Sequence, residues 1–156
     1  MLRSDYEGQN CSIARALEIA GERWTLLIVR DIGLGLRRFD QLQASLGIAR
    51  NVLTDRLNRL VEEGILERVR YSERPERYEY RLTDKGRDLR IALTALRQWG
   101  DTYVSKKPPL LLRRKSDKKP VIAALVPKGT PVLHPGEIET VPGPGSTPTP
   151  AARNRA

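Results

Sequence analysis

The chain has 156 residues, of which 39% are hydrophobic and 30% are charged, with a formal net charge of +9 at pH 7. This length suits one domain of ordinary size plus extensions, and no apolar run reaches the roughly 18 residues of a membrane span, so we expect a cytoplasmic protein without membrane contact. A single cysteine excludes an intrachain disulfide framework and a cysteine-based zinc cluster within one chain.

Two helices are predicted in the first 33 residues. The first, residues 13–20, follows Ser12, a residue type that caps helix N-termini. The second begins near Glu22 and carries apolar residues almost all round, so we expect it to be the most buried helix. Its predicted core stripe contains Trp24, Leu27, Ile28 and Ile32.

A helix-turn-helix is predicted over residues 37–66. A short helix, residues 39–46, ends at Gly47, and a longer helix, about residues 50–63, buries leucines on one face. Its opposite face carries amide, hydroxyl and guanidinium groups, which can read base edges. A plain structural corner shares this pattern, so the stretch alone leaves DNA binding and a corner both open. The candidate DNA-binding residues here are Arg37, Arg38, Arg50, Asn51, Thr54, Asn58 and Arg59.

A β-hairpin is predicted next, because the apolar period changes from helical to alternating. Its strands are residues 66–71 and 78–82, joined by a polar loop, residues 72–77, with Pro75 at the tip. A basic hairpin directly after a helix-turn-helix is typical of a winged-helix wing. Of its five arginines, only Arg74 and Arg77 at the tip are expected to reach a minor groove or the phosphate backbone.

A long helix is predicted to follow Thr83, which has the residue type of a helix cap. Its apolar stripe runs over more than three turns and extends beyond the expected body of the domain. The helix either folds back on its own core or packs against a partner chain, and we favour the partner. The predicted dimer-interface residues are Leu89, Leu93, Leu96, Trp99 and Tyr103.

The composition changes sharply near Ser105, where we expect the folded body, residues 1–104, to end. Residues 1–104 carry a net charge of +2 and residues 105–156 carry +7, and ten of the eleven prolines fall in the second part. The basic clusters in 106–119 either attract DNA without sequence preference or form a solvated extension.

These segments together resemble the successive motifs of HxlR-type winged helix-turn-helix transcriptional regulators over about residues 11–104. The resemblance implies a mainly α fold with a small β-hairpin wing, and a homodimeric regulator that binds double-stranded DNA. It also implies that the first and last helices form the dimer interface, and that the protein has no enzyme activity. No cofactor is expected, because the sequence has neither a glycine-rich phosphate loop nor a cluster with metal-ligand spacing. The motifs are Cys11, ALEIAGERWTLLIVRDI, RRFDQLQASLGIARNVLTDRLNRLVEEGIL, ERYEYRLTDKGRDL and LRQWGDTY.

Two departures limit this resemblance. Ala49 stands where a capping serine or threonine is expected before the longer helix. Residues 105–141 resemble a zinc-ribbon-like extension of some relatives but contain no cysteine, so no metal is expected there. A short hairpin of residues 121–126 with residues 137–141 is the remaining prediction for this extension. Residues 142–156 are predicted to be disordered, because they are rich in proline, glycine and small polar residues.

Cys11 is the one residue with candidate regulatory chemistry. A cysteine just before a helix is commonly a small buried hydrophobe. At a helix N-terminus, however, the dipole favours the thiolate, and some relatives sense electrophiles or oxidants through a cysteine in this region. Both interpretations stay open, with a small electrophile or oxidant as the effector of the second.

Enzymatic function is not indicated, because the only histidine, His134, lies in the extension without a neighbouring acid-base set. The alternative function is a protein-interaction or small-ligand-binding module on a winged-helix fold without specific DNA readout. The modest +2 charge of residues 1–104 is its best support.

Overall fold

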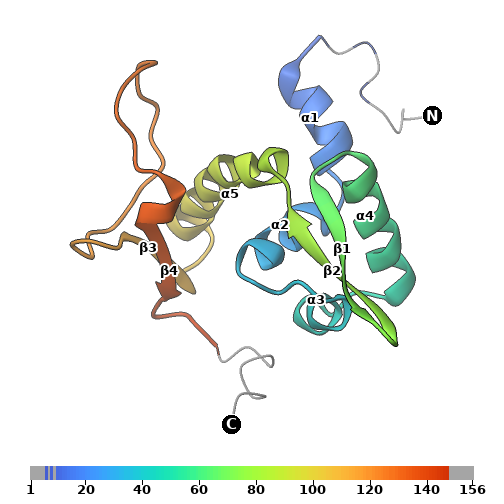
Figure 1. Cartoon of the computed structure of the whole chain (residues 1–156). Coiled ribbons are helices and arrows are strands. Elements are labelled where there is room, and N and C mark those ends of the chain that lie inside the picture. The colour runs from blue at the N-terminus through green and yellow to red at the C-terminus, as the bar shows by residue number, and fades with distance from the viewer. Residues whose placement is uncertain (1–5, 7, 9, 148–156) are drawn as a thin grey trace. The chain divides into compact units, whose positions relative to one another are not determined.

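The computed structural model describes residues 6, 8 and 10–147 and divides into two compact units, with the boundary after Arg90 (Figure 1). No helix in this described part combines the length and apolar content that crossing a membrane requires. In chain order the elements are α1 (Ser12–Ala20), α2 (Thr25–Gly33), α3 (Phe39–Leu46), α4 (Arg50–Glu62), β1 (Leu66–Glu73), β2 (Glu76–Leu82), α5 (Asp84–Tyr103), β3 (Leu110–Arg114), the 3-10 turn η1 (Pro135–Glu137) and β4 (Ile138–Pro142).

The first unit is a winged helix-turn-helix, which confirms the predicted fold class. Helices α3 and α4 are joined by Gly47, whose φ of 62° lies in the left-handed region that glycine adopts cheaply. Strands β1 and β2 pair antiparallel from Leu66 with Leu82 to Glu73 with Glu76. The strands therefore run further than predicted and leave only Arg74 and Pro75 at the tip, and Figure 1 shows this hairpin beside α4.

The core of this unit lies between α2, α3, α4 and the start of β1. Ile28, Leu42, Leu53, Leu57 and Leu60 have no exposed surface. Helix α2 has the most buried residues of the described helices, which confirms the prediction for it.

Two details of the first helices were predicted wrongly. Helix α1 begins one residue earlier than expected, so Cys11 rather than Ser12 occupies the N-cap position, where no side chain caps the helix. Helix α2 begins at Thr25, not near Glu22, because Trp24 has a left-handed φ of 81° that interrupts the helical path. Leu27, predicted in the core stripe, is 38% exposed.

Helix α5 begins with a tight contact to the end of the helix-turn-helix. The Thr83 hydroxyl donates to the Gly64 carbonyl at 2.6 Å and accepts from the Gly86 N–H at 3.1 Å. Thr83 therefore caps the N-terminus of α5, as the sequence predicts. Gly86 is buried, and a Cβ there would lie 2.2 Å from the Ile65 carbonyl oxygen. Only a glycine therefore lets the first turn of α5 approach this closely.

The second unit contains the end of α5 and the extension. Strand β4 pairs antiparallel with β3, with Leu110 opposite Pro142 and Arg114 opposite Ile138. The predicted pairing of residues 121–126 with residues 137–141 is therefore wrong. Pro120 and Pro127 flank residues 121–126 and lack the N–H that a ladder needs. Next to β3 this region makes a bridge of Pro120 with Arg113 and a hydrogen bond from the Val121 N–H to the Leu112 carbonyl at 3.0 Å.

The composition change near Ser105 lies close to the end of a helix, whereas the division between the two compact units falls earlier, after Arg90. Helix α5 runs unbroken across the division between the units and ends at Tyr103, close to the composition change. Within the segment predicted to be disordered, the N–H groups of Gly143 and Gly145 donate to the carbonyls of Pro109 and Pro108 at 2.9 and 3.0 Å. The rest of that segment, residues 148–156, lies outside the described residues.

Charge pairs hold the turns of the extension. Glu139 pairs with Arg113 at 2.6 Å and with Lys118 at 3.0 Å, and Asp117 pairs with Arg114. The Lys115 ammonium group donates to the Gly136 carbonyl at 2.6 Å and so joins the turn after β3 to the 3-10 turn η1. Within the described range, no three His, Cys, Asp or Glu side chains gather as a metal site would need.

Candidate nucleic-acid interface

A buried carboxylate positions α3 against α2. Asp31 on α2 is 2% exposed, and its carboxylate accepts from the Ser45 hydroxyl on α3 and from the Arg30 guanidinium, both at 2.7 Å. A buried carboxylate without partners is costly, so these two donors fix which side of α3 faces α2. Because α4 follows α3 after a short turn, the same contact orients α4.

The outer face of α4 carries unpartnered amides. Leu53, Leu57 and Leu60 are fully buried on the inner face, whereas Asn51 and Asn58 are exposed. Neither amide has a hydrogen-bond partner among the described residues, so the donors and acceptors of both are free for a ligand. Thr54 is also exposed, and its hydroxyl donates to the Arg50 carbonyl at 2.9 Å, which leaves its lone pairs available.

Two arginines of the start of the helix-turn-helix lie over aromatic rings. The Arg50 guanidinium is 5.0 Å from the centre of the Phe39 ring, and that of Arg38 is 4.7 Å from the centre of the Tyr71 ring. These stacks join the start of α4 to α3, and the start of α3 to β1. Arg37 is exposed beside them, and its carbonyl accepts from the Tyr80 N–H of β2 at 2.8 Å.

A bulge in the wing supplies one of these rings. The register of β1 shifts between Arg70 and Ser72, so Tyr71 is the extra residue that opposes no partner. Tyr71 is 39% exposed and lies under the Arg38 guanidinium. The bulge therefore links the wing to the first turn of α3, a link that an even alternation of β1 would not provide.

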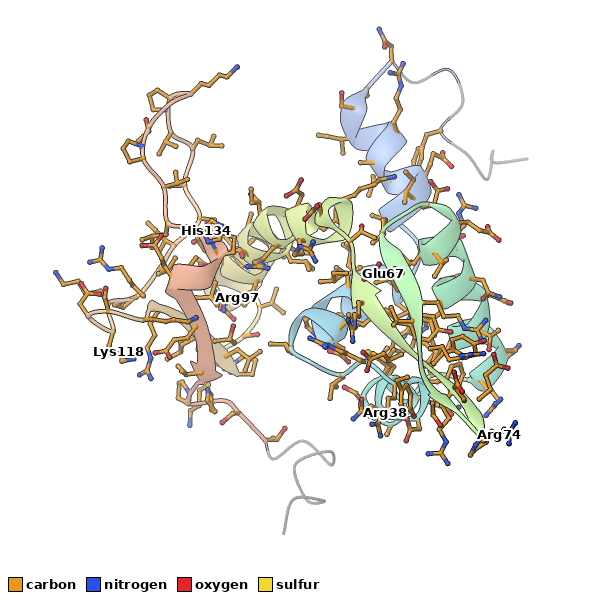
Figure 2. The ribbon with its side chains drawn as sticks, viewed as in Figure 1. Arg38, Glu67, Arg74, Arg97, Lys118 and His134 are labelled. Atoms are coloured by element: carbon orange, nitrogen blue, oxygen red, sulfur yellow. The ribbon has the colours of Figure 1, made fainter. Side chains whose placement is uncertain are left out.

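The five arginines of the wing fall into two groups. Arg68 stacks on Tyr78 at 3.7 Å, Arg70 pairs with Glu73 and Glu76 at 3.3 Å each, and Arg81 pairs with Glu79 at 2.6 Å. The guanidinium groups of Arg74 and Arg77, in contrast, have no partner in the described part of the chain. Figure 2 shows Arg74 at the tip of the hairpin.

One acid of the wing is held ionised. The hydrogen bond from Tyr78, with a smaller contribution from Arg70, keeps the pKa of Glu76 below its usual value, and the same bond raises the pKa of Tyr78. The wing therefore carries a fixed negative group beside Arg70, and the free positive charge is left at Arg74 and Arg77.

Arg59, also predicted to bind DNA, is engaged with acidic and backbone groups of the protein itself. Its guanidinium lies 3.4 Å from the Glu63 carboxylate and 3.4 Å from the Glu18 carbonyl near the end of α1. At a rise of about 1.5 Å per residue, it lies roughly 13 Å along α4 from Arg50. The other predicted arginines come from the start of α3, the start of α4 and the wing, and the aromatic stacks join the start of α3 to α4 and to β1.

The residues predicted for dimer contacts are largely exposed. On α5, Leu96, Trp99 and Tyr103 are 55%, 58% and 73% exposed, whereas Leu89 and Leu93 are half-buried. The rings of Trp99 and Tyr103 lie 5.6 Å apart. On α1, Ile13 is 71% exposed, and the free thiol of Cys11 is also exposed.

Sequence reasoning missed Asp31 and Arg56. Asp31 sits inside an apolar run, and such a position was itself a signal, since a lone acid there must find buried partners. Arg56 follows Asp55 on α4 and appeared as one more charged residue, yet it contacts Glu22 and the Arg23 carbonyl, 34 and 33 residues earlier. No local pattern in the sequence indicates that contact.

Known proteins resemble the chain over this same region. The sequence model of HxlR-like helix-turn-helix proteins matches residues 19–108. An HTH-type transcriptional regulator of Mycobacterium tuberculosis, Rv3095, is 54% identical over 110 residues, covering 69% of this chain and 68% of that protein. Among solved structures, the transcription factor PA1607 is 42% identical with a TM-score of 0.69, covering 78% of this chain and 87% of its own. The redox regulator HypR in its oxidized form is 27% identical with a TM-score of 0.57, covering 61% and 99%.

Proposed function

Because the chain belongs to the HxlR-like helix-turn-helix family of transcriptional regulators, we propose that it is a homodimer that reads a specific DNA sequence with α4. In this proposal α4 enters the major groove, and the wing tip contacts the minor groove or the phosphate backbone. A regulator of this kind acts on the chromosome. In bacteria, the source of its relatives, the chromosome lies in the cytoplasm, and we propose the same location for this protein.

The observation that carries the proposal is the pair of free amides on α4. Asn51 and Asn58 are exposed above a fully buried leucine stripe, and neither amide has a partner among the described residues. An asparagine amide offers a donor and an acceptor together, which matches the adjacent acceptor and donor of an adenine edge. A helix face that was only solvated would need no such matched groups.

The unpaired arginines support contacts between the surface around α4 and the phosphate backbone of DNA. Arg74 at the wing tip and Arg77 near the start of β2 have no acidic partner in the described part of the chain, whereas Arg68, Arg70 and Arg81 are engaged within the wing. Guanidinium groups that keep their charge unpaired can bind phosphates and release counterions. We therefore assign Arg37, Arg38, Arg50, Arg74 and Arg77 to positioning on the duplex.

The exposed apolar residues of α5 support dimerisation. Leu96, Trp99 and Tyr103 are all more than half exposed, and a cluster of large apolar side chains is rarely left in water. A dimer with two-fold symmetry would hold two α4 helices and bind two half-sites about 34–36 Å apart. The target would then be a roughly palindromic sequence.

Thiol sensing through Cys11 is a second proposed function. The thiol is exposed at the N-cap of α1, and HypR, a redox regulator, shares the fold. With one cysteine per chain, oxidation would join the Cys11 sulfurs of two subunits, and a disulfide oxidant would take up the two electrons and two protons released. An electrophile would instead form a bond from the thiolate sulfur to its carbon.

Selection of bound DNA tests the proposal. Purified protein is incubated with genomic fragments, and the bound fragments are sequenced from reduced and from oxidised samples, while sedimentation gives the mass. We expect a dimer at micromolar concentration and an enriched palindromic sequence, with a Cys11→Ser variant insensitive to oxidation. A monomer with unchanged DNA affinity would contradict the dimer, and an enrichment without any common sequence would contradict the readout.

A further inference from the structure

Arg56 connects helix α4 to the segment between α1 and α2, residues 21–24, which we call the joint. One guanidinium nitrogen of Arg56 lies 2.7 Å from the Glu22 carboxylate, and the Nε–H donates to the Arg23 carbonyl at 3.3 Å. One planar guanidinium thus holds a side chain and a backbone group of the same joint. The Arg56 side chain is 26% exposed and that of Glu22 is 45% exposed, so the pair is partly shielded from water.

A second arginine of α4 reaches the same region. Arg59, three residues further along the helix, donates to the Glu18 carbonyl near the C-terminal end of α1 at 3.4 Å. A positive charge there also interacts favourably with the negative end of the α1 dipole. Two side chains from adjacent turns of α4 therefore contact the end of α1 and the joint that follows it.

The joint itself has a strained backbone. Trp24 has a φ of 81°, which is a costly conformation for a bulky residue and persists only where surrounding contacts determine it. Its carbonyl accepts the Ile28 N–H at 2.8 Å, and the Arg23 guanidinium lies 4.9 Å from the centre of its ring. At Gly21 a Cβ would meet the Leu17 carbonyl oxygen at 2.5 Å, so the chain also turns tightly just before the strained residue.

From these contacts we propose that Arg56 is a positioning residue for DNA reading, which sets the orientation of α4 through Glu22 and the Arg23 carbonyl. Arg59 assists it through the Glu18 carbonyl rather than by reading bases. The role rests on the proposed DNA readout by α4. Its consequence is that a displacement of α1, which carries Cys11 at its N-cap, reaches the reading helix through this joint.

The main alternative is that Arg56 contacts a phosphate directly. The two roles predict opposite effects for Glu22, which lies on the joint and not on α4. If Arg56 positions α4, replacement of Glu22 weakens sequence discrimination even though it removes a negative charge. If Arg56 binds phosphate, replacement of Glu22 frees its charge and strengthens binding to every sequence.

Exchange of the two charges is the test. Arg56→Glu and Glu22→Arg are made singly and together, and affinity is measured on the selected site and on a scrambled site, with thermal unfolding as a check of folding. We expect each single variant to lower the specific-to-nonspecific ratio about tenfold, and the double exchange to restore it to within about threefold. A double variant that stays as impaired as Arg56→Glu alone overturns the proposal.

A readout without DNA separates this role from the proposed function. The chain has two tryptophans, so its two indole N–H signals in an NMR spectrum can be assigned with a Trp99→Phe variant. Both single charge variants should shift the Trp24 signal, and the double exchange should return it toward its original position. An unchanged Trp24 signal in both overturns the proposal, while a shifted signal in a protein without sequence preference overturns only the DNA readout.

Matched variants control for charge and for folding. Arg74→Glu reverses the same charge at the wing tip and should weaken binding to both sites alike, with no change at Trp24. Should Arg56→Glu not fold, Arg56→Lys keeps a positive charge for a phosphate but cannot hold both groups of the joint with one planar fork. We expect Arg56→Lys to lower the specific-to-nonspecific ratio several-fold at native thermal stability, and an unchanged ratio would overturn the positioning role.

Discussion

The Ser45 hydroxyl on α3 donates a 2.7 Å hydrogen bond to the carboxylate of Asp31, a buried acid on α2. With the Arg30 guanidinium on the same carboxylate, this bond supplies partners to a polar group that would otherwise be costly to bury in the core. The contact joins α2 to α3. It therefore helps to fix how α3 packs against α2 and, through the short turn, how α4 is oriented.

Ser45→Ala should lower the free energy of unfolding by about 1–3 kcal/mol, because it removes a donor from a buried carboxylate. Urea unfolding followed by circular dichroism measures the change. Ser116→Ala is the matched control, since Ser116 is exposed in the extension, and it should change stability by less than about 0.5 kcal/mol. Equal effects of the two variants would mean that the Asp31–Ser45 bond contributes nothing specific.

Gly86→Ala should destabilise the fold by about 1–3 kcal/mol, because the added Cβ has no space. That Cβ would lie 2.2 Å from the Ile65 carbonyl oxygen, and backbone cannot yield cheaply. Gly100, on the same helix, has nothing within 4 Å of an added Cβ. Gly100→Ala should therefore stabilise α5, by about 0.5–1 kcal/mol, and thermal unfolding of both variants checks the opposite signs.

The helix-turn-helix and the wing could be predicted because their determinants are local. The spacing of Leu53, Leu57 and Leu60 marks the buried face of α4, and a polar tip between alternating residues marks the hairpin. All three leucines are fully buried in the structure. Patterns of this kind depend only on helical and strand periods, which the sequence carries directly.

Features that depend on contacts between distant residues could not be predicted. The left-handed conformation of Trp24 runs against the preference of a bulky residue, and nothing in the local sequence indicates it. The pairing of β4 with β3 joins Leu110 to Pro142, 32 residues apart, although residues 121–126 look more strand-like. In the candidate site, the sequence singled out Arg74 and Arg77 by their position at the hairpin tip, but it did not indicate that Arg68, Arg70 and Arg81 are held by Tyr78, Glu73, Glu76 and Glu79.

Arg74→Ala and Arg77→Ala should weaken binding to specific and nonspecific DNA alike, because phosphate contacts carry no base information. Each should also flatten the dependence of log affinity on log salt, by about one unit for every phosphate that the variant no longer binds. Titrations at several salt concentrations measure this slope. Arg81→Ala is the control, since Arg81 already pairs with Glu79 at 2.6 Å, and a slope reduced equally by Arg81→Ala would contradict the division of the wing arginines.

The extension should respond to acid through Asp117. Its hydrogen bond with Arg114 lowers the pKa of Asp117 from 3.8 to about 2. Because the folded pKa is depressed, the stabilisation is complete above the unfolded pKa and is lost as the pH falls from about 4 to about 2. NMR titration of the Asp117 carboxyl should show this, and Arg114→Ala should return its pKa toward 3.8. An unchanged pKa in that variant would remove Arg114 as the cause.

The most direct test of the account measures base preference after replacement of the free amides on α4. Asn51→Ala and Asn58→Ala proteins are taken through the same selection of bound DNA as the original chain, and affinities are measured on the selected site. We predict a loss of about 1–3 kcal/mol on that site and relaxed preference at one or two base pairs in each half-site, with nonspecific affinity unchanged. The same selected sequence from both variants, or an equal loss of affinity for all sequences, would contradict the claim that α4 reads the bases.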